Sequence, residues 1–364
     1  MPTLTLPDYS GGALVNVIAE VEHRLTGRSA SAPLHEHLAA DVNTGAGYVL
    51  VLFDGLGHHQ LMHPSAAPLA DSEAAAIDSG FPATTTVSLA TVATGAVPRQ
   101  HGLIGYQLWL PDPGVVINTI RWTTLWGDPI PAIDAAGFLP GPNLWERLEA
   151  AGVEAVTVQP ANFVASSLSR ALYRGCRFEG AWTTADLVDA TIALAAPGRL
   201  VFAYVPHVDF AAHVHGQESD EYAEAVGIAA TVWQRLSIRL PADISLVGVA
   251  DHGHIDFPPK SQVRIAKADH EGREFFGDGR AMLVKGEGAS LAETLPATWI
   301  PISAAESWWG PGPAHPAFDA RKPDGILLAD DDVLLLHRFS DDRMVGNHGA
   351  LADAERVIPL LGRG

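Results

Sequence analysis

Four short, uninterrupted apolar runs constrain the fold of this chain more than any other feature of its sequence. They stand at 48–53 (YVLVLF), 155–158 (AVTV), 200–205 (LVFAYV) and 244–250 (ISLVGVA). Continuous apolar runs of this length are typical of strands that are covered on both faces. Segments with apolar residues near helical spacing lie between these runs, at 143–151, 184–196 and 219–238. The alternation predicts an α/β fold with a mostly parallel central sheet and helices on both faces.

The rest of the chain does not demand a second domain, because its 364 residues contain no repeat and no long linker. We therefore expect a single domain over 1–364. A Pro-, Gly- and Trp-rich stretch at 106–139 is predicted to be an aromatic insert or lid, and 257–331 an irregular subdomain. The insert has two alternative uses: its aromatic residues stack a nucleobase or, more commonly for such residues, they pack against the core. These residues are Tyr106, Trp109, Trp122 and Trp126.

The charge balance narrows the classes of partner. Lysine and arginine total 23 against 42 acidic residues, which gives a net charge of −19. Such a balance repels nucleic acid duplexes and anionic lipid surfaces, so we expect neither a duplex nor a membrane as a partner. The segment Met1–Gly12 lacks the pattern of a secretory signal, and no apolar run approaches the ~20 residues of a membrane helix. We expect a cytoplasmic protein, and the sequence leaves its oligomeric state open.

Sixteen histidines accompany this acidity. Histidine and aspartate together are the ligands of zinc, manganese and iron sites. The single cysteine, Cys176, forms no intrachain disulfide and no thiolate cluster. Any metal must therefore be held by nitrogen and oxygen donors.

Three of the apolar runs are followed by an aspartate. Asp54 and Asp251 come directly after their runs, and Asp209 follows Val205 after three residues. Ligands bind beyond the carboxyl ends of the strands in open α/β sheets, so the three carboxylates are expected to converge there. Three bare carboxylates at such close range repel one another, and a bound cation removes the repulsion.

Histidines accompany these aspartates. His213 follows Asp209 by four residues, which places both on one face of a helical turn, and His252 is adjacent to Asp251. His348 lies near the C-terminus between two glycines. A lone Asp after a strand is usually a helix N-cap and a lone DxxxH a surface pair, but together these residues suffice for two metals.

The segment FPATTTVSLATVATG at 81–95 offers a nucleophile. A loop containing a proline and three threonines leads into a predicted helix that ends at Gly95. A hydroxyl at the N-terminus of that helix would meet backbone N–H groups suited to a phosphate, and a nearby metal would activate it. Alternatively, Thr84, Thr85 and Thr86 only cap the helix.

With these motifs the chain resembles the alkaline phosphatase superfamily, and within it the nucleotide pyrophosphatase/phosphodiesterase branch. The resemblance rests on FDGLG (53–57), FPATTTVSLATVATGAVPRQHGLIGY (81–106), DFAAHVHG (209–216), ADHGH (250–254) and NHG (347–349). The motifs occur in the order typical of that family and span nearly the whole chain. The resemblance thus implies an alkaline phosphatase-like catalytic domain.

Carried over position by position, the resemblance implies two divalent metal ions, most often zinc, with manganese as the alternative. It assigns one metal to Asp209, His213 and His348, the other to Asp54, Asp251 and His252, and the role of nucleophile to Thr85. The implied reaction is two successive in-line displacements through a phosphothreonine intermediate. His207 is the preferred candidate for a residue that orients a metal ligand.

The chain departs from the family at two positions near the nucleophile, where Thr84 and Ser88 replace the lysine and asparagine that many members have. Ser88 can still donate one hydrogen bond to a phosphate oxygen, and Tyr106 is a further candidate for substrate binding. No arginine stands in an obvious position to clamp a phosphomonoester, which favours diesters.

We expect a hydrolase of small phosphodiesters or nucleotide pyrophosphates that acts on a small soluble phosphoester. The first alternative is a phosphomonoesterase or phosphonate hydrolase of the same superfamily. The second is a phosphoester-binding protein that has lost catalysis.

Overall fold

The computed structural model describes residues 4–130, 134–135 and 137–363. Its centre is a seven-stranded sheet in the order β2-β18-β9-β1-β8-β6-β7. The strands are β1 (Gly47–Phe53), β2 (Glu73–Asp78), β6 (Glu154–Pro160), β7 (Arg177–Ala181), β8 (Arg199–Val205), β9 (Ile244–Ala250) and β18 (Val357–Gly362). Neighbouring strands pair in parallel except where β18 lies between β9 and β2. This mostly parallel sheet confirms the predicted fold class.

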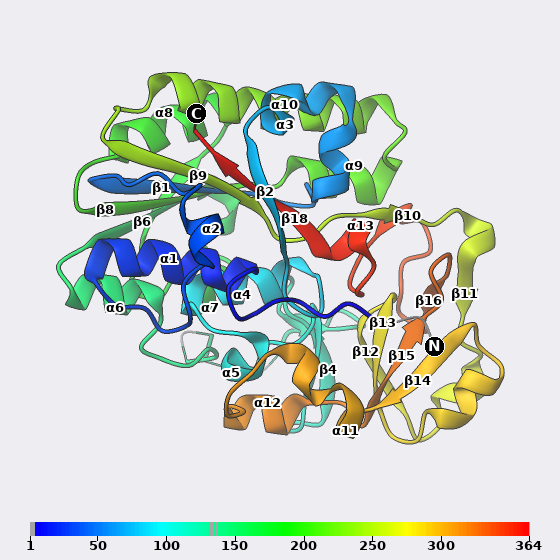
Figure 1. Cartoon of the computed structure of the whole chain (residues 1–364). Coiled ribbons are helices and arrows are strands. Elements are labelled where there is room, and N and C mark those ends of the chain that lie inside the picture. The colour runs from blue at the N-terminus through cyan, green and yellow to red at the C-terminus, as the bar shows by residue number, and fades with distance from the viewer. Residues whose placement is uncertain (1–3, 131–133, 136, 364) are drawn as a thin grey trace.

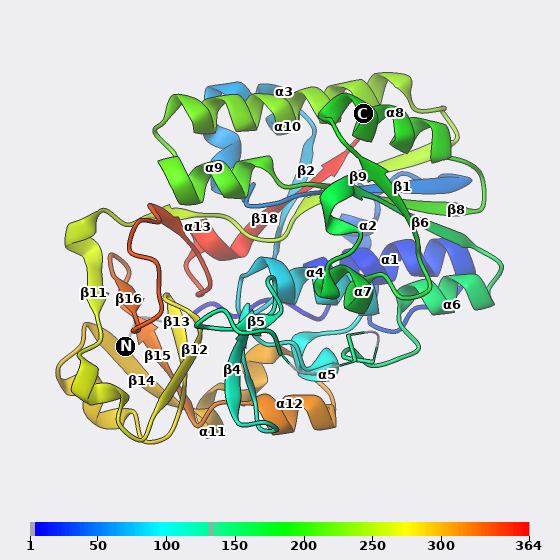
Figure 2. The ribbon, with the colours of Figure 1, turned by 180° about the vertical axis from the view of Figure 1, so that it is seen from behind.

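Helices cover both faces of the sheet (Figures 1 and 2). One face carries α3 (Ala67–Ala70), α8 (Thr184–Leu194), α9 (His207–His215) and α10 (Asp220–Arg239). The other carries α1 (Leu14–Thr26), α4 (Thr85–Thr94), α6 (Leu144–Ala150) and α7 (Ser167–Leu172). Shorter helices are α2 (Glu36–Ala39), α5 (Pro98–His101), α11 (Ile302–Ala305), α12 (Pro316–Arg321) and α13 (Asp353–Arg356).

The sequence signals for helix ends act as expected. Asn143 accepts a hydrogen bond from the backbone of Glu146 at the start of α6, and Ser219 does the same for Tyr222 at the start of α10. Gly95 ends α4 with a φ of 62°, a left-handed conformation that glycine adopts without a steric penalty. Among the described helices, none is long and apolar enough to cross a membrane.

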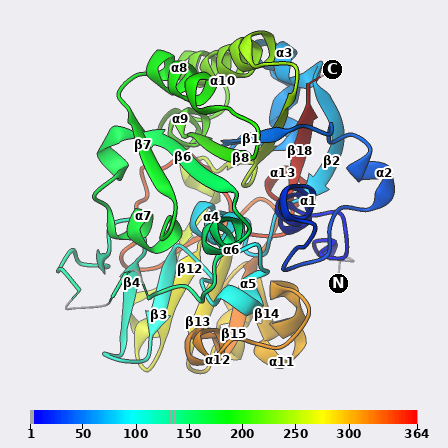
Figure 3. The same ribbon diagram turned by 90° about the vertical axis from the view of Figure 1, so that its left-hand side faces the viewer.

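The two stretches outside the alternation carry sheets of their own. The described part of 106–139, which excludes 131–133 and 136, forms a sheet of β3 (Gln107–Leu110), β4 (Val115–Asn118) and β5 (Thr123–Thr124). The stretch 257–331 contains a four-stranded antiparallel sheet in the order β12-β13-β15-β14. Its strands are β12 (Glu274–Asp278), β13 (Ala281–Lys285), β14 (Ala297–Pro301) and β15 (Gly325–Ala329). In Figure 3 the strands β3 and β4 lie beside β12. Whether 106–139 acts as a lid stays a prediction.

A buried ion pair anchors the turn between β12 and β13 to α13, which directly precedes β18 of the central sheet. Arg280 Nε donates to Glu355 Oε1 over 3.0 Å, and the two side chains are essentially unexposed. The backbone carbonyl of Glu355 accepts from the backbone N–H of Gly253, in the loop after β9. The β12–β13 turn is therefore held next to the carboxyl end of the central sheet.

The register of β1, β8 and β9 places the carboxyl ends of these three strands at the same edge of the sheet. Phe53, the last residue of β1, pairs with Val205 of β8 and with Ala250 of β9. Parallel strands in register end at the same edge of a sheet. The residues that follow these strands therefore meet at this edge.

Candidate metal and phosphoester site

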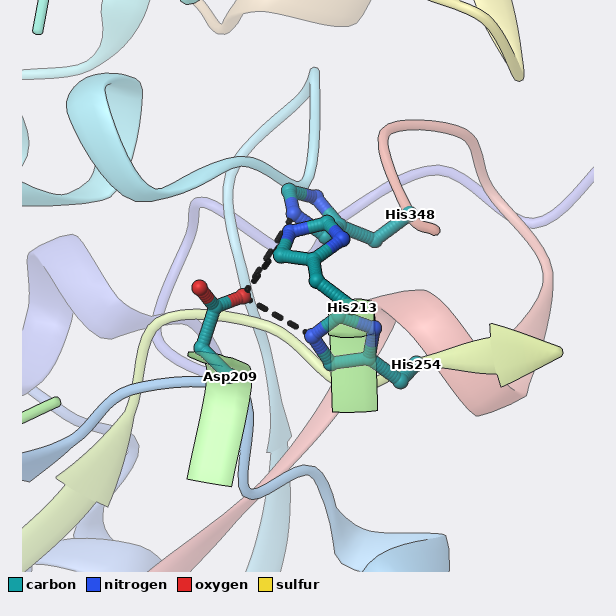
Figure 4. A group of neighbouring side chains, drawn as sticks. All are labelled: Asp209, His213, His254 and His348. Atoms are coloured by element: carbon teal, nitrogen blue, oxygen red, sulfur yellow. Dashed lines mark hydrogen bonds and ion pairs between the residues drawn. The ribbon is translucent and has the colours of Figure 1, made fainter. Parts of the chain in front are cut away.

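Two groups of possible metal ligands lie at this edge. Asp54, Asp251 and His252 form the first group, and all three are buried. The second group consists of Asp209, His213, His254 and His348 (Figure 4). Within each group the possible ligand atoms lie within 4.8 Å of one another. The groups adjoin, because His252 Nε2 is 3.9 Å from Asp209 Oδ1.

The first group is fixed by the strand ends and by hydroxyl groups around them. Asp251 Oδ1 accepts hydrogen bonds from the backbone N–H groups of Gly55 and His252, each over 3.0 Å. Asp251 Oδ2 is buried, has no hydrogen-bond partner among the described residues, and lies 3.6 Å from His252 Nε2. Tyr204, on β8, donates its phenol hydrogen to Asp54 Oδ2. Gly55 has a φ of 73°, and a Cβ there would lie 2.8 Å from the Cα of Asp209, so glycine is required. These contacts orient the two carboxylates toward each other.

The second group comes from three separate elements. Asp209 and His213 stand one turn apart on α9, and His254 and His348 come from the loops after β9 and before α13. His213 Nδ1 donates to the carbonyl of Gly346 over 2.6 Å, and His348 Nδ1 donates to the carbonyl of Ala83 over 2.8 Å. The Nε2 atom of each ring therefore faces Asp209. Figure 4 shows the three imidazole rings around the Asp209 carboxylate. A backbone partner on the far nitrogen is typical of metal-ligating histidines.

Thr85 is the threonine of the nucleophile segment that faces these groups. It is the first residue of α4, and its Oγ lies 3.1 Å from His252 Nε2 and 3.4 Å from Asp54 Oδ1. Its neighbours Thr84 and Thr86 are fully buried, whereas Thr85 is half-buried. The structure thus brings Thr85 together with the six metal ligands that the resemblance implied.

The electrostatics of the cluster fit divalent cations. Burial and the charges of Asp209 and Asp251 raise the pKa of Asp54 well above its usual value. Burial also acts to raise the pKa of Asp209, but His213 and His254 outweigh it and hold that pKa well below its usual value. Among the described residues, no lysine or arginine forms an ion pair with either group. Cations bound by the carboxylate oxygens and imidazole nitrogens would compensate the buried negative charge.

Two residues of the site were not assigned from the sequence. His254 Nε2 lies 2.8 Å from Asp209 Oδ1, and its Nδ1 is buried without a partner among the described residues. The signal for it was present, since His254 is the second histidine of ADHGH. Tyr204 carried no such signal, because a tyrosine in an apolar strand is usually a core residue.

The remaining candidate residues lie nearby, and their proposed roles stay predictions. Ser88 is buried, and its hydroxyl donates to the backbone carbonyl of Asp251 over 2.9 Å, so in this structure it supports the loop of the first group. The Tyr106 hydroxyl accepts from Gln107 Nε2 over 2.7 Å. His207 begins α9, and no hydrogen bond joins its Nδ1 to either group among the described residues.

A buried acid outside both groups leads to a prediction about pH. Burial raises the pKa of Asp278 to about 7, although a hydrogen bond from Thr84 and the charge of His213 act to lower it. A pKa above the unfolded value means that folding favours the protonated acid. The resulting stability is complete below about pH 3.8 and is lost as the pH rises through about 7.

We therefore expect Asp278→Asn to gain stability relative to the wild type as the pH rises. Between pH 5 and pH 8 the free energy of unfolding of the variant, relative to the wild type, should rise by about 2 to 3 kcal/mol. A pKa change from 3.8 to about 7 corresponds to roughly 4 kcal/mol in total, and most of it falls in this pH range. Urea unfolding of the metal-free protein at both pH values measures it, and the exposed Asp331→Asn controls for the loss of one charge. An unchanged stability difference at the two pH values would show that Asp278 titrates normally.

Comparison with known proteins identifies the family of this chain. The family model described as type I phosphodiesterase / nucleotide pyrophosphatase matches residues 48–304, a range that includes Thr85 and all proposed ligands except His348. No curated protein matches the sequence significantly. The match confirms the resemblance that the motifs indicated.

Solved structures of low sequence identity share the fold. Murine ectonucleotide pyrophosphatase / phosphodiesterase 5 is 16% identical with a TM-score of 0.65, over 86% of this chain and 87% of that chain. An inactive variant of the murine protein, in complex with AMP, has the same identity and TM-score over 88% of each chain. Phosphonoacetate hydrolase from Sinorhizobium meliloti 1021, in complex with phosphonoacetate, is 14% identical with a TM-score of 0.63, over 89% of this chain and 90% of that chain.

Proposed function

The chain belongs to the type I phosphodiesterase / nucleotide pyrophosphatase family, and we propose that this phosphoester hydrolase cleaves small phosphodiesters or nucleotide pyrophosphates through a phosphothreonine intermediate on Thr85. The observation that supports the proposal most is the position of the Thr85 hydroxyl. It is half-buried at the first residue of α4, within 3.4 Å of both His252 Nε2 and Asp54 Oδ1. A hydroxyl beside two possible metal ligands and at a helix N-terminus is suited to attack a phosphoryl group.

The residues of the two groups have different proposed roles in metal binding. Asp54, Asp251 and His252 would hold one divalent ion, and Asp209, His213 and His348 the other, with zinc proposed and manganese as the alternative. When bound, the ions supply positive charge that stabilises the attacking and leaving oxygens of an in-line displacement. His254 and Tyr204 orient Asp209 and Asp54 through their hydrogen bonds.

The reaction consists of two displacements. Thr85 Oγ loses its proton to solvent and forms a bond to phosphorus, while the bond from phosphorus to the leaving-group oxygen breaks. A water oxygen then bonds to phosphorus as the bond to Thr85 Oγ breaks, and one proton of that water restores the Thr85 hydroxyl. The free backbone N–H groups in the first turn of α4 favour negative charge on the phosphoryl oxygens.

The charge around the site supports diesters over monoesters. A monoester dianion carries one more negative charge than a diester, and among the described residues no lysine or arginine pairs with either group. The likeness to phosphonoacetate hydrolase favours a second candidate, a phosphonate hydrolase or phosphomonoesterase. The likeness to the AMP complex supports a nucleotide as one form of small phosphoester substrate.

Comparing three substrates tests the proposal. We expect zinc- or manganese-loaded protein to hydrolyse bis(p-nitrophenyl) phosphate with a kcat/KM about 10- to 100-fold above that for p-nitrophenyl phosphate, since the monoester's extra charge lacks a charged hydrogen-bond partner. Phosphonoacetate should release little phosphate. A preference for the monoester or for phosphonoacetate would favour the second candidate, and tight binding of all three without turnover would indicate a binding protein.

A further inference from the structure

His254 is a buried histidine whose contacts go beyond its hydrogen bond to one carboxylate. Its Nε2 lies 2.8 Å from Asp209 Oδ1, and its side chain is essentially unexposed. Its ring packs edge-on against the rings of both His213 and His348, with centroids 4.7 and 5.0 Å away. Figure 4 shows it among the other three side chains of the second group. His254 therefore lies inside the set of residues proposed to hold the second metal.

The spacing of the three imidazole rings in the second group is that of ligands on a single ion. A nitrogen-to-metal bond of about 2.1 Å places each ring centroid about 3.2 Å from the ion, so rings at tetrahedral angles lie about 5.2 Å apart. The three centroid separations within the group are 4.7, 5.0 and 5.2 Å. His252, of the first group, differs because it stacks on His348 at 3.6 Å, with an angle of 19° between the rings. The His254 ring, unlike that of His252, thus has the spacing of a further ligand on the ion of His213 and His348.

The oxygen and nitrogen atoms of the second group also face a common centre. The distances from Asp209 Oδ1 to Nε2 are 3.2 Å for His213, 2.8 Å for His254 and 3.8 Å for His348. Two ligand atoms on one tetrahedral ion, with bonds of about 2.0 to 2.1 Å, lie about 3.3 Å apart, which is the middle of this range. A cation between these atoms therefore requires only small shifts of the side chains.

The backbone holds His254 in this position. Its carbonyl accepts hydrogen bonds from Gln60 Nε2 over 3.0 Å and from Gln217 Nε2 over 3.3 Å. The preceding residue, Gly253, donates its N–H to the carbonyl of Glu355 over 2.8 Å. The ring has no second partner, because its Nδ1 is buried without one among the described residues. The proton can therefore move from Nε2 to Nδ1 without breaking another hydrogen bond, which makes Nε2 available to a cation.

The two groups offer different kinds of ligand once His254 is counted. The second group then has three imidazoles and one carboxylate, whereas the first has two carboxylates and one imidazole. Imidazole nitrogens suit zinc, and carboxylate oxygens suit magnesium and manganese. An additional protein ligand also makes release of the bound ion less favourable. The second group is therefore expected to hold zinc more tightly than the first.

We propose that His254 is a fourth protein ligand of the second metal, so that the second group retains zinc while the first group exchanges its ion with manganese. This inference rests on the proposed function and narrows it to a centre with one permanent and one exchangeable ion. The exchangeable ion is the one beside Thr85, because the Thr85 hydroxyl lies against His252 and Asp54 of the first group.

Metal exchange tests the difference between the two groups. Protein loaded with zinc alone is dialysed against an excess of manganese, and its metal content is measured by inductively coupled plasma mass spectrometry. For the wild type we expect one zinc and one manganese ion per chain, because only the carboxylate-rich first group accepts manganese readily.

The variant His254→Gln separates ligation from orientation of Asp209. Its amide nitrogen can still donate a hydrogen bond to Asp209, but it is not a zinc ligand. We expect the Kd of the retained zinc, measured by competition with a chromophoric chelator, to rise more than about 100-fold, beyond the effect of losing an orienting partner. His215→Gln is the matched control, because His215 also lies on α9 but belongs to neither group, and its zinc Kd should equal the wild-type value.

A crystal structure of the zinc-loaded wild type keeps the inference testable if His254→Gln fails to fold. We expect His254 Nε2 about 2.0 to 2.1 Å from the zinc ion that Asp209 binds. A zinc ion held by Asp209, His213 and His348 alone, with His254 still hydrogen-bonded to Asp209, would overturn the inference.

The outcomes separate this inference from the proposed function. If the wild type binds no metal ion, the proposed metal-dependent function is wrong. If it binds two zinc ions but manganese replaces both equally, or if His254→Gln holds zinc within about tenfold of the wild-type Kd, His254 is not a ligand although the proposed function stands. An equal loss of zinc affinity in His215→Gln would assign the effect to α9 in general and would also overturn the inference.

Discussion

Thr85→Ala is expected to lower kcat for bis(p-nitrophenyl) phosphate by about 10³-fold or more, because the variant lacks the oxygen that attacks phosphorus. Thr85→Ser keeps a hydroxyl at the start of α4 and should retain measurable turnover. Binding should survive in Thr85→Ala, so the Kd for a nucleoside monophosphate should stay within about tenfold of the wild-type value. Steady-state kinetics and calorimetry measure the two effects.

Thr86→Val is the matched control for this prediction. Thr86 is the next residue of α4 and is fully buried, and its hydroxyl has no hydrogen-bond partner among the described residues. Valine has nearly the same shape, so kcat should stay within a few-fold of the wild-type value. Full activity in Thr85→Ala, or an equal loss in Thr86→Val, would rule out Thr85 as the specific nucleophile.

Removal of metal is expected to have the second large effect. A chelator should lower hydrolysis of the diester by about 10³-fold or more, and added zinc or manganese should restore it, because the buried carboxylates otherwise repel the substrate anion. The protein should bind the metal more tightly as the pH rises. The pKa of Asp54 is raised, so its carboxyl must lose a proton before a cation binds there. Metal analysis of the loaded protein should give two ions per chain.

Single ligand variants distinguish the two sites. Asp54→Asn and Asp209→Asn should each reduce the metal content from two ions to one, because they disrupt different groups. His58→Gln is the control, since His58 pairs with Glu73 and belongs to neither group. Loss of both ions in either aspartate variant would indicate one shared centre, and full activity after exhaustive chelation would exclude a metal-dependent reaction.

The sequence was sufficient to predict the parts of the site that follow from local pattern. Asp54 and Asp251 could be placed together because each follows a buried strand, and parallel strands end at one edge. The helix that Gly95 ends placed the three threonines near its N-terminus, and the family resemblance selected Thr85 among them. In each case the position depends on an element of fewer than about twenty residues, so its pattern is visible in the sequence.

The parts that were not predicted depend on contacts between distant segments. Asp278 is 194 residues from Thr84 in the sequence, and Tyr204 is 150 residues from Asp54. No local sequence pattern predicts that the Tyr204 side chain contacts the end of β1, or that Asp278 lies beside Thr84. Ser88 makes a contact of the same kind, because its hydroxyl donates to the carbonyl of Asp251, 163 residues away, whereas its contact with substrate stays a prediction. Tertiary packing, not local propensity, decides such contacts.

Detection of the covalent intermediate tests the central claim most directly. Metal-loaded protein would be mixed with bis(p-nitrophenyl) phosphate, quenched in acid within the first turnovers and digested, and the peptide that contains Thr85 analysed by mass spectrometry. We predict a p-nitrophenyl phosphoryl group on Thr85 in the wild type, preceded by a burst of p-nitrophenol, and neither signal in Thr85→Ala. Steady turnover without a burst, together with an unmodified Thr85, would contradict a covalent intermediate on Thr85. So would steady turnover without a burst in which the adduct is found on another residue.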